Sequence, residues 1–442
     1  MEETQLHFLG IDGDTGCPFH RPTFGRDLAE LGGRVPPGGR LVRYGVNPGK
    51  LEEAGWGVVF ARGCDPAIRT ALEPLLAWRR MQASARYQEL VYTPRAEAGS
   101  FTRALRGSFG AVDPERIPYY LLLVGDVDVI PQGFQMGLDA QHAVGRLAFE
   151  NPADYACYAA NVVEVEREAV ARAPRMSLFG PSHAGDRATE LSLGELVRPL
   201  AKTLRATRPA AAIHTLEGSA ATRDALVELL LEAPDLVFTA GHAVCFRKDH
   251  LKQRRRQGAI VCADWPGPGS GPTFEGQFFA AEDVPAKADL RGRIFFHFGC
   301  YTAGTPRLDA FDEMRQADRW ELTSKPFVAA LPQALLAHPS GGALAVVGHV
   351  DRAWPDSFIW DGFHQIDAFE DAFKALLDGM PLGWALEPFG QRHADLARRM
   401  AESSLHPGDP DYEPPDPAQF WTAYNDARGY VVLGDPAVRL VV

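Results

Sequence analysis

The 442-residue sequence predicts an α/β protein, a three-layer α/β/α sandwich around a mostly parallel, doubly wound sheet. Short apolar runs alternate with amphipathic stretches of helical period along most of the chain, which is typical of a parallel sheet. The alternation occurs in two units, residues 1–166 and 167–442, and we expect the two similar halves to share one sheet. Two apolar runs also end abruptly at Gly-His and Gly-Cys, as central strands do when they carry functional groups.

The first half contains three strand patterns and three helix patterns. Asp65 and Pro66 have the positions of an N-cap and a first helical residue, and apolar residues follow at helical spacing. The run that ends at Gly125 is too apolar for an edge strand. The expected strands are 56–61, 89–92 and 119–125, and the expected helices start near Asp65, Ser100 and Pro152.

The second half repeats the pattern with five strands and four helices, and a long insertion at 247–290 interrupts it. Two further short strands are expected around Gly434-Asp-Pro436. The expected strands are 176–179, 212–215, 235–242, 293–300 and 343–347, and the expected helices are 193–204, 221–231, 325–337 and 366–378.

Composition narrows the class of protein. The chain is 46% hydrophobic and 23% charged, which excludes full disorder. Its net charge of −12 argues against nucleic acid as a partner and favours a basic partner or substrate. The start of the sequence shows no secretory signal, and no apolar run is long enough to cross a membrane. The six cysteines are scattered without a CxxC and are expected to be reduced. We therefore expect a cytoplasmic protein with no membrane partner.

His242 and Cys300 are the candidate catalytic residues, because each stands at the carboxyl end of a predicted central strand. A cysteine nucleophile needs an imidazole nearby, so Cys300 would attack a carbonyl and His242 would protonate the leaving group. The backbone amides of Cys300 and Ala243 would bind the oxyanion, and Gly299 would admit the substrate. Strand-end placement alone also fits two buried core residues, and it does not decide between these interpretations.

The sequence resembles the gingipain-type and CHAT-type cysteine peptidases of the caspase-like superfamily. Six blocks carry the resemblance, in the family's order, across residues 120–440. They are Tyr120-Leu-Leu-Leu-Val-Gly-Asp-Val-Asp-Val-Ile-Pro131, Val144-Gly-Arg-Leu147, Thr239-Ala-Gly-His242, Phe298-Gly-Cys-Tyr-Thr-Ala-Gly304, Gly341-Gly-Ala-Leu-Ala-Val-Val347 with Trp354, and Leu433-Gly-Asp-Pro436.

The resemblance implies a caspase-like fold and a cysteine endopeptidase that cleaves polypeptides and needs no cofactor. The high Ala, Arg and Gly content fits a bacterial origin, and the resemblance then suggests a triggered protease of defence or cell death. The sequence shows no recognisable sensor or repeat domain, so we expect a separate activating protein. The chain departs from the family at Ala243, where the family has glycine after the histidine. This departure keeps a second interpretation open, a catalytically silent member of the fold that binds peptides.

Specificity and processing residues are predicted from the same resemblance. Asp139 matches an acidic residue that selects arginine or lysine in the primary pocket, and a carboxylate is a sound partner for such side chains. Trp354 would wall that pocket. Asp351 and Asp356 are alternative pocket carboxylates, and Asp139 also fits an exposed loop residue. The basic stretch Arg254, Arg255 and Arg256 is a candidate autoprocessing site, although a solvated basic loop is the favoured interpretation.

A zinc site is the chemical alternative, because His242, Cys245, His297 and Cys300 all carry ligand atoms. The paired short spacings of structural zinc sites are missing, and His297 should point to the opposite face of the sheet from Cys300. We therefore expect no metal.

Overall fold

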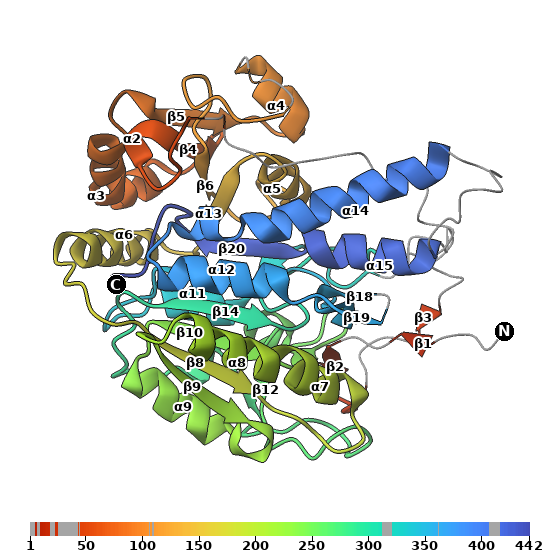
Figure 1. Ribbon diagram of the computed structural model, residues 1–442. Helices are drawn as coiled ribbons and strands as arrows, with labels where there is room; N and C mark the ends of the chain where they lie inside the picture. The colour runs from red at the N-terminus through yellow and green to blue at the C-terminus, as the bar shows by residue number, and fades with distance from the viewer. Residues whose placement is uncertain are drawn as a thin grey trace.

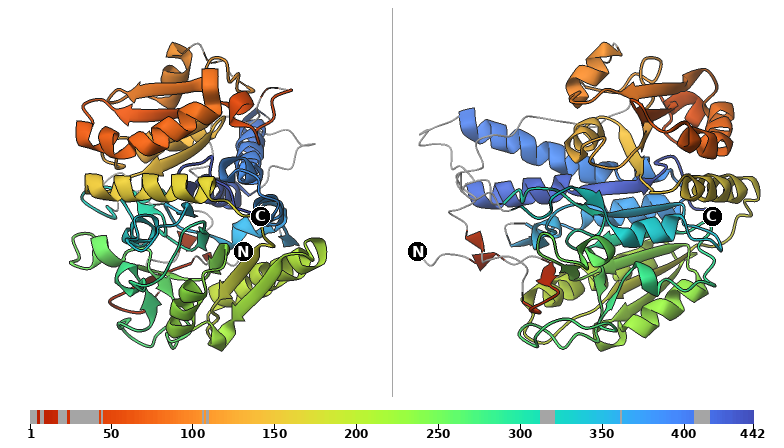
Figure 2. Two further views of the ribbon diagram at one scale, coloured as in Figure 1. Left: turned by 90° about the vertical axis from the view of Figure 1, so that its left-hand side faces the viewer. Right: turned by 180° about the vertical axis from the view of Figure 1, so that it is seen from behind.

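The computed structural model describes residues 5–6, 9–17, 23–24, 43, 45–105, 107, 110–311, 321–360, 362–405 and 416–442. Its centre is a ten-stranded sheet in the order β5-β4-β6-β7-β20-β17-β14-β10-β8-β9. Figure 1 shows this sheet from β4 and β5 near the top to β9 near the bottom, with α8, α12 and α14 in front of it. Figure 2 shows helices on both faces. The predicted α/β/α sandwich around a mostly parallel sheet is confirmed.

The first half supplies one edge of the sheet. Its strands pair in parallel, and alternate residues point to opposite faces. In β4, Val58 packs in the core on the side of α3 and α6, whereas Val59 packs in the core with α4 and α5. The elements are β4 (Trp56–Ala61), α3 (Pro66–Ala83), β5 (Tyr87–Tyr92), α4 (Ala98–Ala104), β6 (Tyr120–Val124), α5 (Gln132–Asp139), β7 (Ala143–Leu147) and α6 (Pro152–Arg167).

The second half supplies the other edge, and its central strands are completely buried and mostly apolar. The principal elements are β8 (Arg175–Gly180), α7 (Arg187–Leu191), α8 (Arg198–Thr207), β9 (Ala212–Glu217), α9 (Arg223–Glu232), β10 (Leu236–Ala240), β14 (Ile294–Phe298), α11 (Ala330–Leu336), β17 (Ala345–His349), α12 (Asp367–Leu377), α14 (Glu387–Leu405), α15 (Pro417–Arg428) and β20 (Tyr430–Gly434).

Several elements differ from the sequence-based expectation. The helix expected at 193–204 contains a π-helical turn, Ser192–Val197, before α8. The insertion 247–290 carries β12 (Ile260–Val261) and β13 (Phe278–Phe279). These strands join β11 (Ala243–Cys245) and β2 (Gly10–Asp12) in a four-stranded sheet. Within the described residues, the two closing strands expected around Gly434 are one strand, β20.

Strand β20 joins the two halves. It runs parallel to β7 of the first half and antiparallel to β17 of the second. Directly after it, the buried Asp435 accepts hydrogen bonds from Arg79 Nε at 2.7 Å and Trp56 Nε1 at 2.9 Å. Arg79 also binds Glu166 at 2.6 Å. The last strand is thus held to α3, β4 and α6. The proposed division at residue 166 falls at the end of α6 and stays a prediction.

Replacing Arg79 tests this junction. The Arg79 side chain is 1% exposed. Because Arg79→Met leaves the buried Asp435 without its cation, we expect the free energy of unfolding to fall by about 3–5 kcal/mol. Chemical denaturation measures the change. Arg80→Met on the same helix, where the side chain is 45% exposed, should cost less than about 0.5 kcal/mol. Equal losses in the two variants would contradict the role of the junction.

Candidate active site

The two strands β10 and β14 bring His242 and Cys300 to one edge of the sheet. They are parallel neighbours, and Ala240 faces Phe298 in their register. Gly241 N continues the pairing by donating to Phe298 O at 3.1 Å. His242 and Cys300 each follow these partners by two residues, so both side chains leave adjacent strands at the same level. The predicted pair is therefore brought together, and both residues are buried.

The chain turns sharply after Cys300. Tyr301 has a φ of 59°, which lies in the left-handed region that residues other than glycine rarely adopt. Such a conformation costs about 1–3 kcal/mol and persists only where the surroundings enforce it. Here Tyr301 is buried, and its amide donates to Asp351 O at 3.0 Å. The turn holds the Cys300 side chain at the end of β14 instead of allowing the strand to continue.

Asp186 completes the site, and sequence analysis missed it. Its Oδ2 lies 2.8 Å from Nε2 of His242 and accepts a hydrogen bond from Thr189 Oγ1 at 2.7 Å. Burial opposes ionisation of Asp186, but the charge and hydrogen bond of His242 and the hydroxyl of Thr189 outweigh it and lower its pKa to about 2. Asp186 is thus a carboxylate at neutral pH that orients the imidazole.

This contact decides which imidazole nitrogen is the base. Because Nε2 of His242 faces the Asp186 carboxylate, Nε2 carries the proton of the neutral ring. Nδ1 is buried and has no hydrogen-bond partner among the described residues. The unprotonated Nδ1 is therefore the atom that can take the thiol proton and later deliver it to a leaving amine.

The thiol of Cys300 is buried from solvent. Cys300 is 0% exposed, and Ala353 N donates to its Sγ at 3.3 Å. Burial raises the pKa of the thiol, although the Ala353 amide and the Arg352 guanidinium act in the opposite direction. The nucleophile is therefore protonated in this state, and attack requires transfer of its proton to a base.

The two predicted oxyanion donors both lie beside the Leu9–Gly10 peptide bond, and one of them already donates a hydrogen bond. The Cys300 amide donates to Leu9 O at 2.9 Å. Ala243 pairs with Gly10 in the β2–β11 register, so its amide lies beside the same peptide bond. Gly299 has a different reason to be glycine. A Cβ there would lie 2.8 Å from Gly241 O of the neighbouring strand, so the close strand packing itself requires glycine.

Trp354 and Asp351 flank Ala353, whose amide contacts the Cys300 thiol. The Trp354 ring is buried, with its centroid 5.1 Å from that of Phe311. Burial and the nearby Asp309 raise the pKa of Asp351. Arg352, between Asp351 and Ala353, forms a buried ion pair with Asp309. The alternative carboxylate Asp356 lies in the next turn, where its backbone carbonyl accepts from Arg392.

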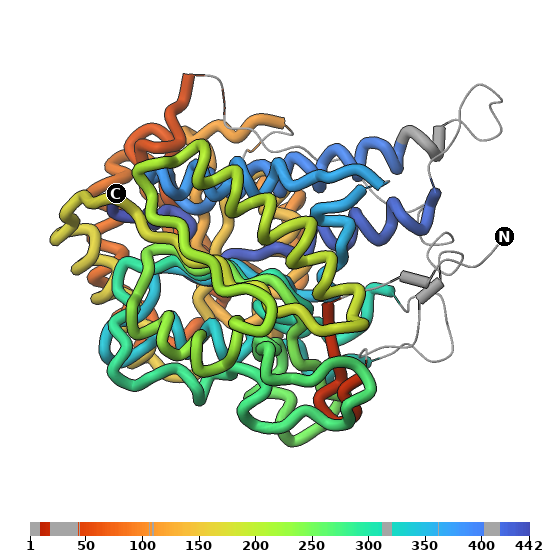
Figure 3. Tube along the Cα trace, turned by 60° about the horizontal axis from the view of Figure 1, so that its bottom comes forward, coloured from red at the N-terminus to blue at the C-terminus, as the bar shows by residue number. Residues whose placement is uncertain are grey.

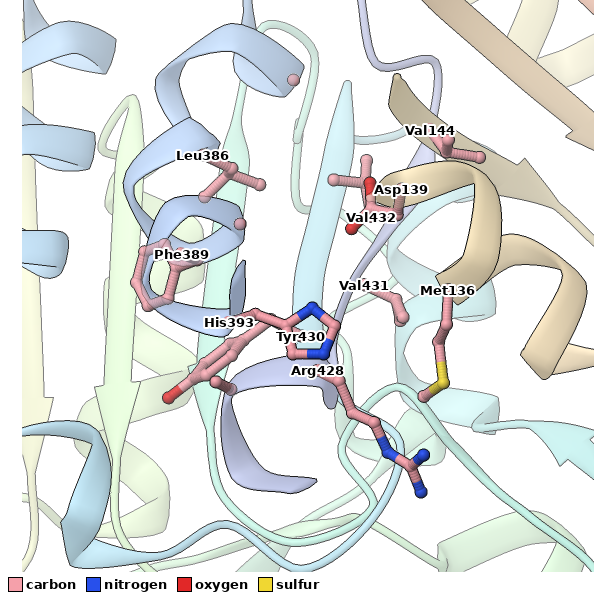
Figure 4. Close-up of a pocket in the computed structure, with 13 residues that line it drawn as sticks. Met136, Asp139, Val144, Leu386, Phe389, His393, Arg428, Tyr430, Val431 and Val432 are labelled. Carbon is pink, nitrogen blue, oxygen red and sulfur yellow. The ribbon is translucent and has the colours of Figure 1, made fainter. Parts of the chain in front are cut away.

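Asp139 lies elsewhere. It ends α5 and lines a pocket with Met136, Val144 and Arg428, between α5 and α14 (Figure 4). Neither His242 nor Cys300 lines this pocket. The structure therefore does not bring Asp139 together with the predicted nucleophile and base.

The basic stretch of the insertion forms a helical turn, α10 (Gln253–Arg256). Arg256 pairs with Glu275 at 2.7 Å and also with Glu282, and Arg254 lies 5.1 Å over the ring of Phe327. Arg255 is exposed. Peptidases bind their substrates as extended segments, so cleavage here requires this turn to unfold locally. Autoprocessing at these arginines stays a prediction.

The zinc hypothesis receives no support from the described part of the chain, which contains no cluster of three or more potential metal ligands. His297 binds Thr239 Oγ1 through Nδ1 at 2.9 Å, and burial lowers its pKa to about 3. Helices long and apolar enough to span a bilayer are also absent from the described residues.

The signal for Asp186 was present in the sequence. It follows β8, the strand beside β10, in the loop Pro181-Ser-His-Ala-Gly-Asp186. Because parallel neighbours end at one edge, an acidic residue after this strand could have been predicted as a partner of His242. The order of the strands in the sheet was needed to recognise it.

A thiol, an imidazole with a free nitrogen, an orienting carboxylate and backbone amides at the edge of an α/β/α sandwich define a cysteine peptidase. Comparison with known proteins agrees. Residues 64–441 match the model of peptidase family C25, and the chain belongs to this family.

Solved structures show the same fold. The arginine-specific cysteine proteinase gingipain R is 14% identical with a TM-score of 0.52, and the match covers 90% of this chain and 80% of that one. A structure described only as a protease is 11% identical with a TM-score of 0.52, over 88% and 78% of the chains. The complex of pro- and mature domains of RgpB from Porphyromonas gingivalis is 12% identical with a TM-score of 0.50, over 87% and 79%. No curated protein matches the chain.

Replacing Asp186 tests its orienting role. Asp186→Asn removes the charge that fixes the tautomer of His242, so we expect kcat to fall by roughly 10²–10⁴-fold with little change in KM. Peptidase kinetics on a fluorogenic peptide measure this. Asp224→Asn, at a side chain that is 90% exposed, is the matched control and should leave kcat unchanged. An active Asp186→Asn enzyme would remove Asp186 from the site.

The lowered pKa of Asp186 also predicts how stability depends on pH. The folded pKa of about 2 lies below the ordinary value of 3.8, so the stabilisation is complete above pH 4 and is lost as pH falls through 2. It amounts to roughly 2 kcal/mol. Denaturation of the wild type and of Asp186→Asn at pH 6, 4 and 3 should give a stability difference that shrinks toward low pH. A constant difference would contradict the ion pair.

Proposed function

We propose that this chain is an endopeptidase in which Cys300 is the nucleophile, His242 the general acid and base, and Asp186 the residue that orients the imidazole. The observation that carries the proposal is the 2.8 Å contact between Asp186 Oδ2 and His242 Nε2, on the strand next to Cys300. It leaves Nδ1 as a free base at the edge where the thiol lies.

The reaction follows from these positions. The Cys300 thiol passes its proton to Nδ1 of His242, and the thiolate attacks the substrate carbonyl. The amides of Cys300 and Ala243 bind the oxyanion. His242 then protonates the leaving amine, and water hydrolyses the thioester with His242 as base. Ala243 retains a backbone amide, so replacement of the family's glycine leaves a donor in place.

Location and role complete the proposal. All six cysteines are free thiols, which supports a reducing, intracellular compartment. The covered thiol of Cys300 supports an enzyme that must be triggered, in keeping with the resemblance to CHAT-type peptidases and their activating proteins. A bacterial defence or cell-death circuit is the setting that this resemblance favours.

The preference for arginine or lysine stays a prediction. Asp139 lines another pocket, so a basic preference would depend on Asp351, beside the Arg352–Asp309 pair near the thiol. The library described below includes basic, acidic and apolar side chains for this reason.

Hydrolysis of a fluorogenic peptide library tests the function. The library carries arginine, lysine, aspartate or leucine before the scissile bond, and wild type is compared with Cys300→Ala. We expect cleavage by the wild type and a loss of at least about 10³-fold in the variant, because the nucleophile is missing. The exposed Cys17→Ala is the matched control and should retain full activity. Peptide binding without cleavage under all conditions would favour the silent, peptide-binding alternative.

A further inference from the structure

The N-terminal segment lies in the candidate active site. Leu9 N donates to Ala353 O at 3.0 Å, and Leu9 O accepts from Cys300 N at 2.9 Å. The backbone of Leu9 thus connects Cys300 to Ala353. A bound substrate must place the carbonyl under attack on the amide of the nucleophile in the same way. Leu9 therefore has the position of the residue that precedes a scissile bond.

Gly10 continues through the site. It pairs with Ala243, which directly follows His242. A Cβ on Gly10 would lie 3.1 Å from both Cβ and Sγ of Cys300, which is closer than ordinary van der Waals contact. The glycine therefore lets the chain pass against the sulfur. The Leu9–Gly10 peptide bond is placed between the thiol and the strand that begins after the imidazole.

The residues after this bond are firmly bound. Gly10–Asp12 form β2, parallel to β11, and Gly13 N donates to Cys245 O at 2.8 Å. The Asp12 carboxylate then accepts from the amides of Asp14 and Thr15 at 2.9 Å each. Figure 3 shows this red segment enclosed by green segments of the second half. An added strand of this kind is a common way for an enzyme to hold an extended peptide.

The side chain that precedes the bond is apolar. Leu9 is 0% exposed and belongs to the main hydrophobic core, and its amide is bonded to the carbonyl of Ala353, the residue before Trp354. The Asp309 carboxylate near this place is already paired with Arg352. The primary pocket therefore holds a leucine in this state. The cation that pairs with Asp309 is Arg352 of the protein itself, not a substrate side chain.

We propose that Leu9–Gly10 is a built-in substrate, which the enzyme cleaves in its own chain, and that the primary pocket accepts leucine-like side chains. The inference rests on the proposed function and names a substrate class for the same site. Until the cut, the segment covers the thiol.

Cleavage of the Leu9–Gly10 bond needs water as its only further reactant. Cys300 Sγ forms a bond to the Leu9 carbonyl carbon and its proton passes to His242. The bond from that carbon to Gly10 N breaks, and His242 gives the proton to this nitrogen. Water then attacks the thioester, which releases the chain up to Leu9 with a carboxylate and restores the thiol. The new amino terminus is Gly10, and the part of the site before the scissile bond becomes open.

Intact mass and N-terminal sequencing of the incubated protein test the proposal. We expect a new terminus at Gly10 in the wild type, at a rate independent of protein concentration, and none in Cys300→Ala. Leu9→Asp puts an unpaired charge into an apolar site, so self-cleavage should slow at least about tenfold. Iodoacetamide should label Cys300 of this variant at least about tenfold faster than Cys300 of wild type that has not yet been cut. Leu9→Met keeps the apolar character and should still be cleaved. Leu251→Asp, at a residue that is 97% exposed, is the matched control and should behave as wild type.

The outcomes separate this inference from the proposed function. If Cys300-dependent cleavage of the peptide library occurs while Leu9–Gly10 stays intact, self-cleavage is overturned and the peptidase stands. A library preference for arginine or lysine over leucine overturns the pocket assignment. If neither the library nor the chain is cut, and Cys300 is labelled equally slowly in wild type and Leu9→Asp, both proposals fail. Thermal unfolding of each variant confirms that it is folded.

Discussion

The parallel ladder between β10 and β14 is the constraint on which the rest of the site depends. Because Ala240 faces Phe298, the two strands lead to His242 and Cys300 after the same number of residues. A shift of this register by one residue would turn one of the two side chains to the opposite face of the sheet. On the other side of β10, β8 delivers the loop that carries Asp186. Three neighbouring strands therefore set the order carboxylate, imidazole and thiol.

The sheet that contains this register is completed where the two halves are joined. β20 is antiparallel to β17, whereas the other described strand pairs of this sheet are parallel, and it returns the chain to the first half. The buried Asp435 behind it accepts from Arg79 and Trp56, which belong to a helix and a strand formed much earlier in the chain. Unpaired charge in this place would be costly, so the final strand has one well-defined position. The second half thus has a rigid border on the side of β17.

Local patterns predicted the fold well, and tertiary pairing explains what they missed. The runs at β4 and β6 are apolar on both faces, and those at β10, β14 and β17 are apolar except for Thr239, His297 and His349, so their burial was evident. The Asp65 N-cap is confirmed, since its side chain accepts from Ala67 N. By contrast, β2 is three residues long, and its partner β11 lies more than 200 residues away, which no local pattern reveals. Asp139 fails as a neighbour of Cys300 because it ends α5 beside β7 and β20, and β17 separates these strands from β14. Recognition of Asp186 needed the strand order.

Gly10 also has a consequence for the redox chemistry of the protein. A Cβ at this position would lie 3.1 Å from Sγ of Cys300 and 3.2 Å from Sγ of Cys245, so the segment fills the space that both sulfurs border. Oxidation requires an accessible thiolate, and here both thiols are buried with raised pKa values. With the segment in place, we therefore expect both thiols to react slowly with peroxide. Exposure of this space would make the two sulfurs neighbours in water, and an opened enzyme would then need a reducing medium to keep its nucleophile.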